Sequence, residues 1–375
     1  MLRASEATKR LLRLLAIDVP IVQAPMAGVS TPQMAAAVSS AGALGSIGVG
    51  AAADVAAVQA MLTSFRSYLH RDDRLNNAMP MPLNVNVFCH RPAKADVAVE
   101  RAWIDKLRPE FARYNAQPPE ALTEIYRSFV AGGDDSVLDL LVRERPRVVS
   151  FHFGVPSREH IRALHGAGIV LLGTATSLAE ARVLVDADVD VIVAQGYEAG
   201  GHRGVFDPDA PDDQLSTMAL VQLLVRSVDR PVIAAGGLMD GAGIAAALKL
   251  GAAAAQLGTA FIACNESLAD SGYRAALLQG DAAYHTTMTR AISGRPARCL
   301  ANRFTAIDLP DAASVPAYPI AYDLGKQLNA AAKAQGEHGY GAQWAGQGAP
   351  LVRSNLPAGD LVRTLLAELN HSSHS

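Results

Sequence analysis

Short apolar runs that end in small or polar residues recur along the chain and alternate with amphipathic stretches. A run such as Val191–Val193, which has no polar residue inside it, indicates a strand buried on both faces, as is typical of a parallel sheet. Stretches of helical periodicity, such as Arg158–Gly166, separate most of the runs. Eight such units predict an α/β fold of the closed (β/α)8 TIM-barrel type. The expected strands are Ile21–Ala27, Ala43–Ile47, Leu83–Cys89, Val148–Gly154, Ile169–Thr174, Val191–Gln195, Val232–Gly236 and Ala253–Thr259.

A doubly wound open sheet is the alternative to a barrel. No G-x-G-x-x-G turn follows the first expected strand, which disfavours an open sheet that binds a dinucleotide. Residues 5–16 have the pattern of an amphipathic helix, which we expect to close one end of the fold rather than to act as a targeting segment. The other expected helices include Thr31–Ala41, Ser177–Ala187, Leu215–Val228 and Gly241–Leu250.

Two regions lie outside the regular alternation. Residues 90–147, after the third strand, form a much longer connection than the others, with helical patterning at Val97–Tyr114 and Pro119–Val130. Residues 265–375 form an alanine-rich tail. We therefore predict a barrel domain over residues 1–264, with an insertion at 90–147 that crosses the top of the barrel, and a smaller, mostly helical lobe over residues 265–375. This lobe is expected to cover the C-terminal face of the barrel and in part to return to the site.

Composition narrows the class of protein. Half of the residues are hydrophobic, which allows a large core, and the net charge of −3 gives no electrostatic reason to expect nucleic acid or an anionic membrane as a partner. The longest weakly polar region, Met34–Val58, contains Asp54 and is not expected to span a membrane. The three cysteines, Cys89, Cys264 and Cys299, are widely spaced, which is typical of free thiols in a reducing cytoplasm.

The most informative turn follows the expected strand Val191–Gln195. Residues 194–204 read Ala-Gln-Gly-Tyr-Glu-Ala-Gly-Gly-His-Arg-Gly, so glycines surround a histidine and an arginine. Glycine lets backbone approach a ligand closely, and α/β enzymes carry their chemistry at the carboxyl ends of strands. His202 in this turn is therefore a candidate ligand contact, although a histidine on such a loop can equally be solvated.

Two further glycine turns favour a ligand that carries a phosphate. Ala235-Gly-Gly237 ends the seventh expected strand, and Gln256-Leu-Gly-Thr259 ends the eighth. Phosphate sites in barrels commonly combine these two turns with a helix N-terminus. Asp240 is the expected N-cap of the helix that begins near Gly241. Double glycines can also serve only to pack a strand against a helix, but the occurrence of both turns at strand ends favours the phosphate.

The first and third strands end in residues that suit a flat ring system and the core equally well. Met26, in the segment Gln23–Gly28, is as consistent with core packing as with a ligand contact. Asn84 and Asn86 share one face of their strand because side chains alternate along it. Buried amides need hydrogen-bond partners, which are either neighbouring strands or the heteroatom edge of a flavin.

His152 is the strongest candidate for acid–base chemistry. It ends the fourth expected strand, where catalytic residues of barrels gather, and histidine titrates near neutral pH. A core histidine bonded to backbone is the alternative. No H-x-x-x-H or H-E-x-x-H pattern and no paired cysteines predict a metal site, and no G-x-S-x-G elbow predicts a serine hydrolase.

Four segments taken together resemble the nitronate monooxygenases, formerly called 2-nitropropane dioxygenases, and most closely the class I enzymes. The similarity extends over most of residues 20–304, including Ser293-Gly-Arg-Pro-Ala-Arg298. The four segments are Gln23-Ala-Pro-Met-Ala-Gly-Val-Ser-Thr-Pro32, Asn84-Val-Asn-Val-Phe-Cys-His90, Val148-Val-Ser-Phe-His-Phe-Gly154 and Gln195-Gly-Tyr-Glu-Ala-Gly-Gly-His-Arg-Gly204.

The resemblance implies an oxidoreductase that binds FMN in a TIM barrel, with His152 as the active-site histidine. The implied reaction is the oxidation of alkyl nitronates, above all propionate 3-nitronate, with neutral nitroalkanes as further candidate substrates. One electron would pass to the flavin, its semiquinone would react with O2, and the products would be a carbonyl compound and nitrite. A cytoplasmic monomer or homodimer is expected. The expected FMN contacts are Ala24, Pro25, Met26, Asn86, Gln195, Gly200, Gly201, His202, Gly236, Gly237, Gln256, Leu257, Gly258, Thr259 and Ser293.

Two other functions are compatible with the same motifs. One is an NAD(P)H-dependent flavin reductase that acts on a quinone or an enoyl-acyl carrier protein. The other is a non-catalytic sensor of a phosphate ligand, which the histidine at a strand end disfavours.

Overall fold

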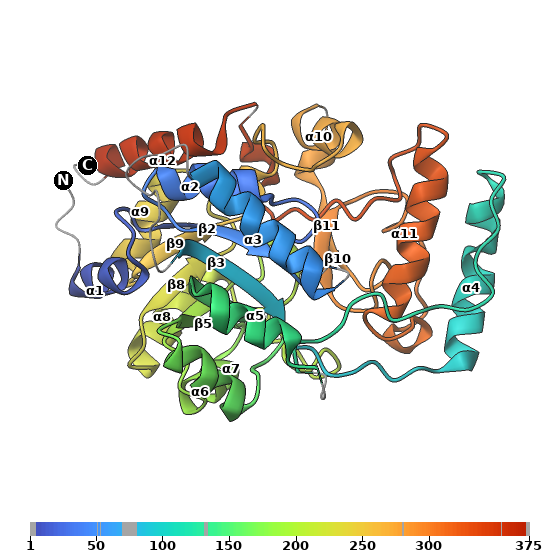
Figure 1. The fold of residues 1–375 in the computed structure, drawn as a ribbon. Coiled ribbons are helices and arrows are strands. Elements are labelled where there is room, and N and C mark those ends of the chain that lie inside the picture. Colours follow the sequence, from blue (N-terminus) through green and yellow to red (C-terminus); the bar gives the residue numbers. More distant parts are fainter. Residues whose placement is uncertain are drawn as a thin grey trace.

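Eight parallel strands form the centre of the molecule. The computed structural model describes residues 5–50, 52, 54–69, 81–130, 134–279, 281–353 and 355–372. The strand order is β1-β9-β8-β6-β5-β4-β3-β2, and a parallel bridge between Val22 and Leu44 closes the sheet into a barrel (Figure 1). Each strand overlaps one expected run, which confirms the predicted (β/α)8 fold. The strands are β1 (Ile21–Gln23), β2 (Gly45–Gly48), β3 (Met81–Phe88), β4 (Pro146–His152), β5 (Val170–Ala175), β6 (Val191–Gln195), β8 (Val232–Ala235) and β9 (Ala254–Leu257).

Helix α1 (Glu6–Leu15) closes the amino-terminal end of the barrel. Ser5 caps this helix by accepting a hydrogen bond from the Thr8 amide at 3.1 Å. Leu11 and Leu15 are fully buried in one cluster with residues such as Val148, which lie early in the barrel strands. The expected amphipathic helix is therefore confirmed, and burial of its apolar stripe holds it in place.

The helices that follow the barrel strands form the outer layer. Thr31, Ser157, Ser177, Ser216 and Asp240 each cap one of them by accepting the backbone amide three residues further on. These caps explain why the predicted helix starts agree with the observed ones. The outer helices are α2 (Pro32–Ser40), α3 (Val55–Leu69), α5 (Ser136–Glu144), α6 (Arg158–Gly166), α7 (Leu178–Asp186), α8 (Thr217–Ser227) and α9 (Gly241–Lys249).

The long connection after β3 leaves the barrel and packs on the C-terminal part of the chain. Its helix α4 (Val97–Ala112) lies beside α11 (Ile320–Lys333) at one end of the molecule (Figure 1). Trp103 of α4 and Leu324 of α11 are buried in the same cluster. The connection and the tail thus share a small hydrophobic core of their own.

The helix predicted over Pro119–Val130 is wrong, because this segment has no helical residue in the structure. The amide and hydroxyl of Thr123 both donate to Asp323 Oδ2 at 2.9 Å, and the Phe129 amide donates to the Phe88 carbonyl at 2.8 Å. Groups that a helix would pair internally are thus bonded to α11 and β3 instead. The periodicity of a sequence segment carries no information about such long-range hydrogen-bond partners.

A small antiparallel sheet joins the tail to the glycine turn after β6. Its strands are β7 (Gly201–His202), β10 (Thr286–Thr289) and β11 (Ala297–Leu300), in the order β10-β11-β7. Ala297 pairs with His202, and Arg298 pairs with Gly201. The segment after the barrel therefore returns to the carboxyl ends of the strands.

The last part of the tail lies on the outside of the barrel. Helix α10 (Ser271–Leu278) follows the last barrel strand, and α12 (Ala358–Ser372) packs against α2 and α9 (Figure 1). Leu361 and Leu365 of α12 are buried in that contact.

The predicted division into a barrel domain (residues 1–264) and a lobe (residues 265–375) stays a prediction. None of the described helices is both long and apolar enough to cross a membrane.

Candidate active site

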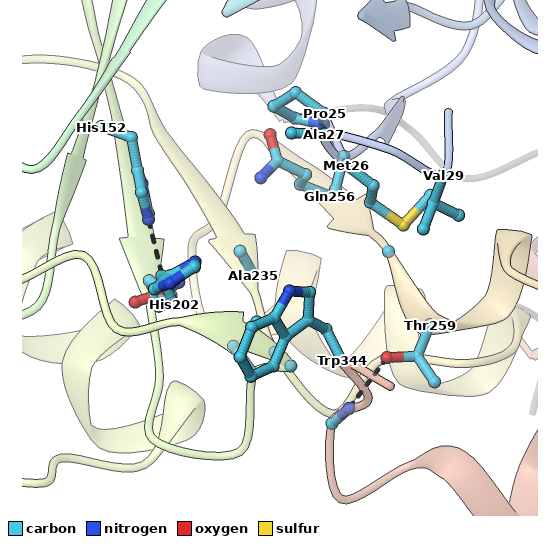
Figure 2. Close-up of a pocket in the computed structure, with 18 of the residues that line it drawn as sticks. Pro25, Met26, Ala27, Val29, His152, His202, Ala235, Gln256, Thr259 and Trp344 are labelled. Carbon is cyan, nitrogen blue, oxygen red and sulfur yellow. Dashed lines mark hydrogen bonds between the residues drawn. The ribbon is translucent and has the colours of Figure 1, made fainter. Parts of the chain in front are cut away.

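A cavity lies at the carboxyl ends of the barrel strands, between the barrel and the residues of the tail and the long connection (Figure 2). Its empty space, with the open mouth included, is about 1350 Å³. All predicted site residues except Leu257 and Ser293 line it, so turns that are far apart in the sequence meet around one space. The predicted residues on the wall are Ala24, Pro25, Met26, Asn86, His152, Gln195, Gly200, Gly201, His202, Gly236, Gly237, Gln256, Gly258 and Thr259.

The two exceptions lie behind the wall. The Leu257 side chain faces the outer helices, because neighbouring side chains of a strand point to opposite faces. A contact between Leu257 and a ligand would therefore have to come from its main chain, whose carbonyl already accepts the Ala24 amide at 2.8 Å. Ser293 is buried, and its Oγ lies 2.9 Å from Nε2 of His202. It contacts a wall residue rather than the cavity itself.

The turn after β8 requires glycine for its conformation and for space. Gly236 and Gly237 have φ angles of 117° and 72°, which side chains disfavour. A Cβ on Gly236 would lie 2.9 Å from the Thr217 hydroxyl and 3.0 Å from the Ala199 nitrogen. Gly237 and Thr259 border the same cavity, as a shared phosphate site requires.

The N-terminus of α9 already has acceptors for its first amides. Asp240 accepts the Gly243 amide at 2.8 Å, which confirms the predicted N-cap. Glu368 from α12 accepts the Gly241 amide at 3.0 Å. Both carboxylates lie at the positive end of the helix dipole, which stabilises their negative charge. A phosphate at the Gly236–Gly237 turn would therefore depend on the turn itself rather than on α9.

The tail crosses the barrel turns at Gly346. The Gly346 amide donates to Oγ1 of Thr259 at 3.0 Å (Figure 2), which leaves the Thr259 hydroxyl proton for another acceptor. The Gln347 amide donates to the Glu198 carbonyl at 2.9 Å. A Cβ on Gly200 would lie 2.5 Å from the Gly346 nitrogen, so this crossing needs glycine. It also holds neighbouring Trp344 beside the cavity (Figure 2).

The two asparagines of β3 pair with neighbouring strands. Nδ2 of Asn84 donates to the Ser46 hydroxyl at 3.1 Å. Nδ2 of Asn86 donates to the carbonyl and the hydroxyl of Ser150, at 3.1 and 3.0 Å. Asn86 also borders the cavity, whereas Asn84 is buried away from it. Of the two asparagines, only Asn86 can therefore contact a ligand in the cavity.

Gln195 fixes the glycine turn after β6. Its Oε1 accepts the Gly204 amide at 2.7 Å, and its Nε2 donates to the His202 carbonyl at 3.1 Å. Arg203 donates to the Gln195 carbonyl at 2.6 Å and to both oxygens of Asp212, at 2.7 and 2.9 Å. The turn that carries His202 is thus held from both sides by buried hydrogen bonds.

The two cavity histidines are linked through one carbonyl. His152 Nε2 lies 3.2 Å from the His202 carbonyl oxygen (Figure 2). A carbonyl only accepts, so we infer that Nε2 of His152 carries the proton and that Nδ1 has a free lone pair. The ring of His202 is held by the Ser293 hydroxyl on one side and lies 5.0 Å from the Trp344 ring.

Burial keeps both histidines uncharged near neutral pH. The pKa of His152 is lowered to about 4, first by burial and then by the charges of Arg295 and Arg203, while the hydrogen bond to the His202 carbonyl acts in the opposite direction. The pKa of His202 also lies well below its usual range, because of burial first and then of His152 and Arg295. Either ring can therefore accept a proton at neutral pH.

Sequence reasoning missed the aromatic side of the cavity. Except for Phe88, which ends β3, these residues come from the long connection and the tail, where no strand end marks a site. Their only sequence signal is the i, i+4, i+8 spacing of Tyr318, Tyr322 and Lys326, which places the last two on one face of α11. The Lys326 ammonium lies 4.8 Å from the Tyr126 ring and 5.4 Å from the Tyr322 ring. The aromatic residues on the wall are Phe88, Tyr126, Tyr273, Tyr318, Tyr322 and Trp344.

The described residues include no group of three or more His, Cys, Asp or Glu side chains that could hold a metal ion.

Comparisons with known proteins agree on one family. A sequence profile described as nitronate monooxygenase matches residues 8–368. The nitronate monooxygenase of Paraburkholderia phytofirmans is 58% identical over 366 residues, which cover 97% of this chain and 96% of the relative. The nitronate monooxygenase of Pseudomonas aeruginosa is 51% identical over 364 residues, 96% of this chain and 99% of the relative.

Two solved structures are similar over nearly the whole length of this chain. A nitroalkane oxidase from Streptomyces ansochromogenes is 40% identical, with a TM-score of 0.86 and coverage of 97% of this chain and 99% of the other. FabK from Thermotoga maritima is 27% identical, with a TM-score of 0.71 and coverage of 97% of each chain.

Proposed function

Because this chain belongs to the nitronate monooxygenase family and is thus an oxidoreductase, we propose that it oxidises alkyl nitronates with bound FMN and O2, and that propionate 3-nitronate is a substrate. The observation that carries this proposal is the convergence of the turns at Gly236–Gly237 and Gln256–Thr259 with two uncharged histidines on one cavity. A carbonyl compound and nitrite are the expected products.

The cavity fits a flavin mononucleotide in three respects. Gly236, Gly237 and Gly258 leave one side free of side chains, so main-chain amides can approach a phosphate. A Cβ at Gly258 would lie 3.4 Å from the Ala24 Cβ and 3.7 Å from the Met26 sulfur, so the small residues of two turns form one apolar surface suited to a flat ring. The amides of Asn86, Gln195 and Gln256 supply polar groups around it.

When bound, FMN would accept electrons from the nitronate and pass them to O2, so the protein itself need only bind, orient and exclude water. His152 would act on the proton: with Nε2–H held by the His202 carbonyl, its Nδ1 can take the α-proton of a neutral nitroalkane. A nitronate has already lost that proton and needs no base. His202, on the same cavity and equally uncharged, is the second candidate for this role.

Lys326 lines a second pocket that shares Tyr126, Tyr322 and Trp344 with the cavity, and it offers a place there for the remote carboxylate of propionate 3-nitronate. It is one helical turn from Tyr322, and none of the described carboxylates forms an ion pair with it. The Lys326 residue is exposed overall, but partial burial by its neighbours lowers its pKa. A carboxylate beside it would restore the favourable charge interaction.

The proposal is tested by the absorption spectrum of the purified protein before and after anaerobic addition of propionate 3-nitronate. We expect a yellow protein that releases FMN on denaturation, one-electron reduction of the flavin by the nitronate, and nitrite release once O2 is admitted. Colourless protein that takes up no flavin on reconstitution would overturn the cofactor assignment. Rapid bleaching by NADH without nitrite release would favour the NAD(P)H-dependent flavin reductase that the sequence motifs also allow.

A further inference from the structure

Phe153, the residue after His152, has an unusual backbone conformation. Its φ is +73°, in the left-handed region that a bulky side chain rarely adopts, and its ring is almost fully buried. The ring centroids of Phe153 and His152 are 4.4 Å apart. Any movement that relieved this backbone strain would also move His152, so neighbouring contacts must hold the pair in place.

Arg295 provides such a contact. The centre of its guanidinium lies 4.2 Å from the centroid of the Phe153 ring, in cation–π geometry. Arg295 is 3% exposed, and its Nη2 donates to the Val205 carbonyl. Its Nε is buried without a hydrogen-bond partner among the described residues.

A second buried arginine shows what is unusual about Arg295. Arg203 is as deeply buried, but Asp212 pairs with it through two hydrogen bonds. No described carboxylate forms an ion pair with Arg295. An uncompensated buried charge is unfavourable for folding, so its presence against Phe153, the neighbour of His152, calls for a role in the site.

The ring of Phe153 contacts both this charge and titratable groups of the site. Around it are the rings of His90 at 6.3 Å, His202 at 5.7 Å and Tyr318 at 5.5 Å, in addition to His152. Burial raises the pKa of Tyr318, which therefore stays uncharged. Burial first, and then the charge of Arg295, lower the pKa of His90 to about 4.

The other charged groups that act on these histidines are few. Arg203 lowers the pKa of His152, but its charge is neutralised by Asp212. Glu180 and Asp209 act on Arg295 at longer range, and Arg290 acts on it with the opposite sign. Arg295 thus contributes the uncompensated charge in this part of the site.

We propose that Arg295 is a positioning residue of the active site: its guanidinium, stacked on Phe153, holds the strained backbone next to His152 and sets the positive potential in which His152 and His202 work. The charge keeps both histidine rings unprotonated near neutral pH and favours the anionic form of a nitronate in the cavity. The part of this inference that concerns catalysis rests on the proposed function, whereas the part that concerns the histidines does not.

Two substitutions separate the charge from the stacking. Arg295→Met removes the charge, and Arg295→Lys keeps the charge but loses the planar guanidinium. Arg290→Met is the matched control, because Arg290 lies in the same segment, pairs with exposed Asp209 and is absent from the cavity wall. Should Arg295→Met fail to fold, Arg295→Gln retains a donor for the Val205 carbonyl and takes its place.

The first readout is the titration of the histidine ring signals by NMR in the flavin-loaded protein, assigned with His152→Gln and His202→Gln. We expect Arg295→Met to make protonation of both rings about tenfold easier, and Arg295→Lys and Arg290→Met to leave the titrations close to those of the parent. Unchanged titrations in Arg295→Met would overturn the electrostatic role. This readout needs no turnover, so it stands even if the substrate assignment fails.

The second readout is the pH dependence of kcat with a neutral nitroalkane. Arg295→Met should move the acid limb of the profile upward, whereas a purely structural defect would lower kcat at every pH without moving the limb. Arg295→Lys should lower kcat without displacing the limb, because the stack on Phe153 is lost. A Lys variant with the parent's kcat would show that the stacking does not position His152.

Discussion

The cavity has two walls that differ in chemistry and in how the chain builds them. The barrel wall consists of strand ends, which contribute small residues, side-chain amides and His152. The opposite wall consists of aromatic residues from the long connection and the tail, among them Tyr126, Tyr322 and Trp344. Main-chain amides and small residues suit a phosphate and a flat ring, whereas large aromatic side chains with polar edges suit selection of a small substrate. We infer that the barrel wall holds the cofactor and the proton chemistry, and that the aromatic wall governs the substrate.

The strongest test of the barrel wall is His152→Ala. We expect FMN to remain bound and kcat/KM on a neutral nitroalkane to fall by about 10²- to 10⁴-fold, because a general base is lost. Turnover of a preformed nitronate should fall much less, because that anion needs no base. Steady-state nitrite release with both substrates measures the difference.

His165→Ala is the control for this test, since His165 pairs with Asp190 outside the cavity and should leave both activities unchanged. An equal loss on both substrates in His152→Ala would assign His152 to anion binding rather than to proton transfer. A full loss in His202→Ala but not in His152→Ala would move the base to His202.

Gly236→Ala tests the barrel wall as the holder of the cofactor. The added Cβ would lie 2.9 Å from the Thr217 hydroxyl at a φ of 117°, so the turn has to shift. Strain of this kind is worth about 1–3 kcal/mol, which predicts a rise of roughly 5- to 150-fold in the FMN dissociation constant. Flavin fluorescence titration of the apoprotein measures it.

Gly168→Ala is the matched control, because Gly168 also has a positive φ, of 77°, but a Cβ there meets nothing within 4 Å. It lies between α6 and β5, at the amino-terminal side of the barrel, and should lower stability without weakening FMN binding. If both variants bind FMN as the parent does, the Gly236 turn is not a cofactor contact.

The two walls also differ in how far the sequence predicts them. Each barrel strand is a short local segment, so its buried run and the turn that follows reveal it, and parallel strands necessarily bring those turns to one edge. Strand alternation further explains why Gln256 reaches the cavity and its neighbour Leu257 does not. The sequence pattern alone therefore predicts that the motif residues of this wall lie together.

The aromatic wall depends on contacts that no local pattern encodes. Tyr126 lies in the segment wrongly predicted as helical, which Thr123 anchors to Asp323 200 residues away. Trp344 is held by the crossing of Gly346 over Thr259, a contact across 87 residues. Long-range hydrogen bonds of this kind override periodicity, so this wall becomes visible only in three dimensions.

A fall in pH tests the region between the two walls, where the histidines with lowered pKa values lie. His90 and His152 have pKa values of about 4 in the fold because of burial, against about 6.5 in an unfolded chain. The unfolded chain therefore binds protons first as pH falls, so the stability they contribute is complete above pH 6.5 and is lost between pH 6.5 and 4. Each histidine should reduce the free energy of unfolding by up to about 2 kcal/mol between pH 7 and pH 5.

Urea unfolding at the two pH values measures this loss, and His90→Gln should make it smaller because one of the titrating groups is gone. The same loss in the parent and in His90→Gln would show that the junction is not where acid acts. Equal stability at both pH values in the parent would contradict the burial of these rings.

The smallest effect is expected from the aromatic wall. Trp344→Ala removes a ring that packs 5.0 Å from His202 and 6.2 Å from Tyr322, while the Tyr273 hydroxyl still has the residue 344 carbonyl to bond. Aromatic pairs contribute about 0.5–1.5 kcal/mol, so KM for a nitronate should rise by roughly 2- to 10-fold with little change in FMN affinity. Tyr284→Ala, at an exposed aromatic outside the cavity, is the control and should change neither value. If FMN affinity in Trp344→Ala falls as far as substrate affinity does, the two walls do not act separately, because one side chain would then serve cofactor and substrate alike.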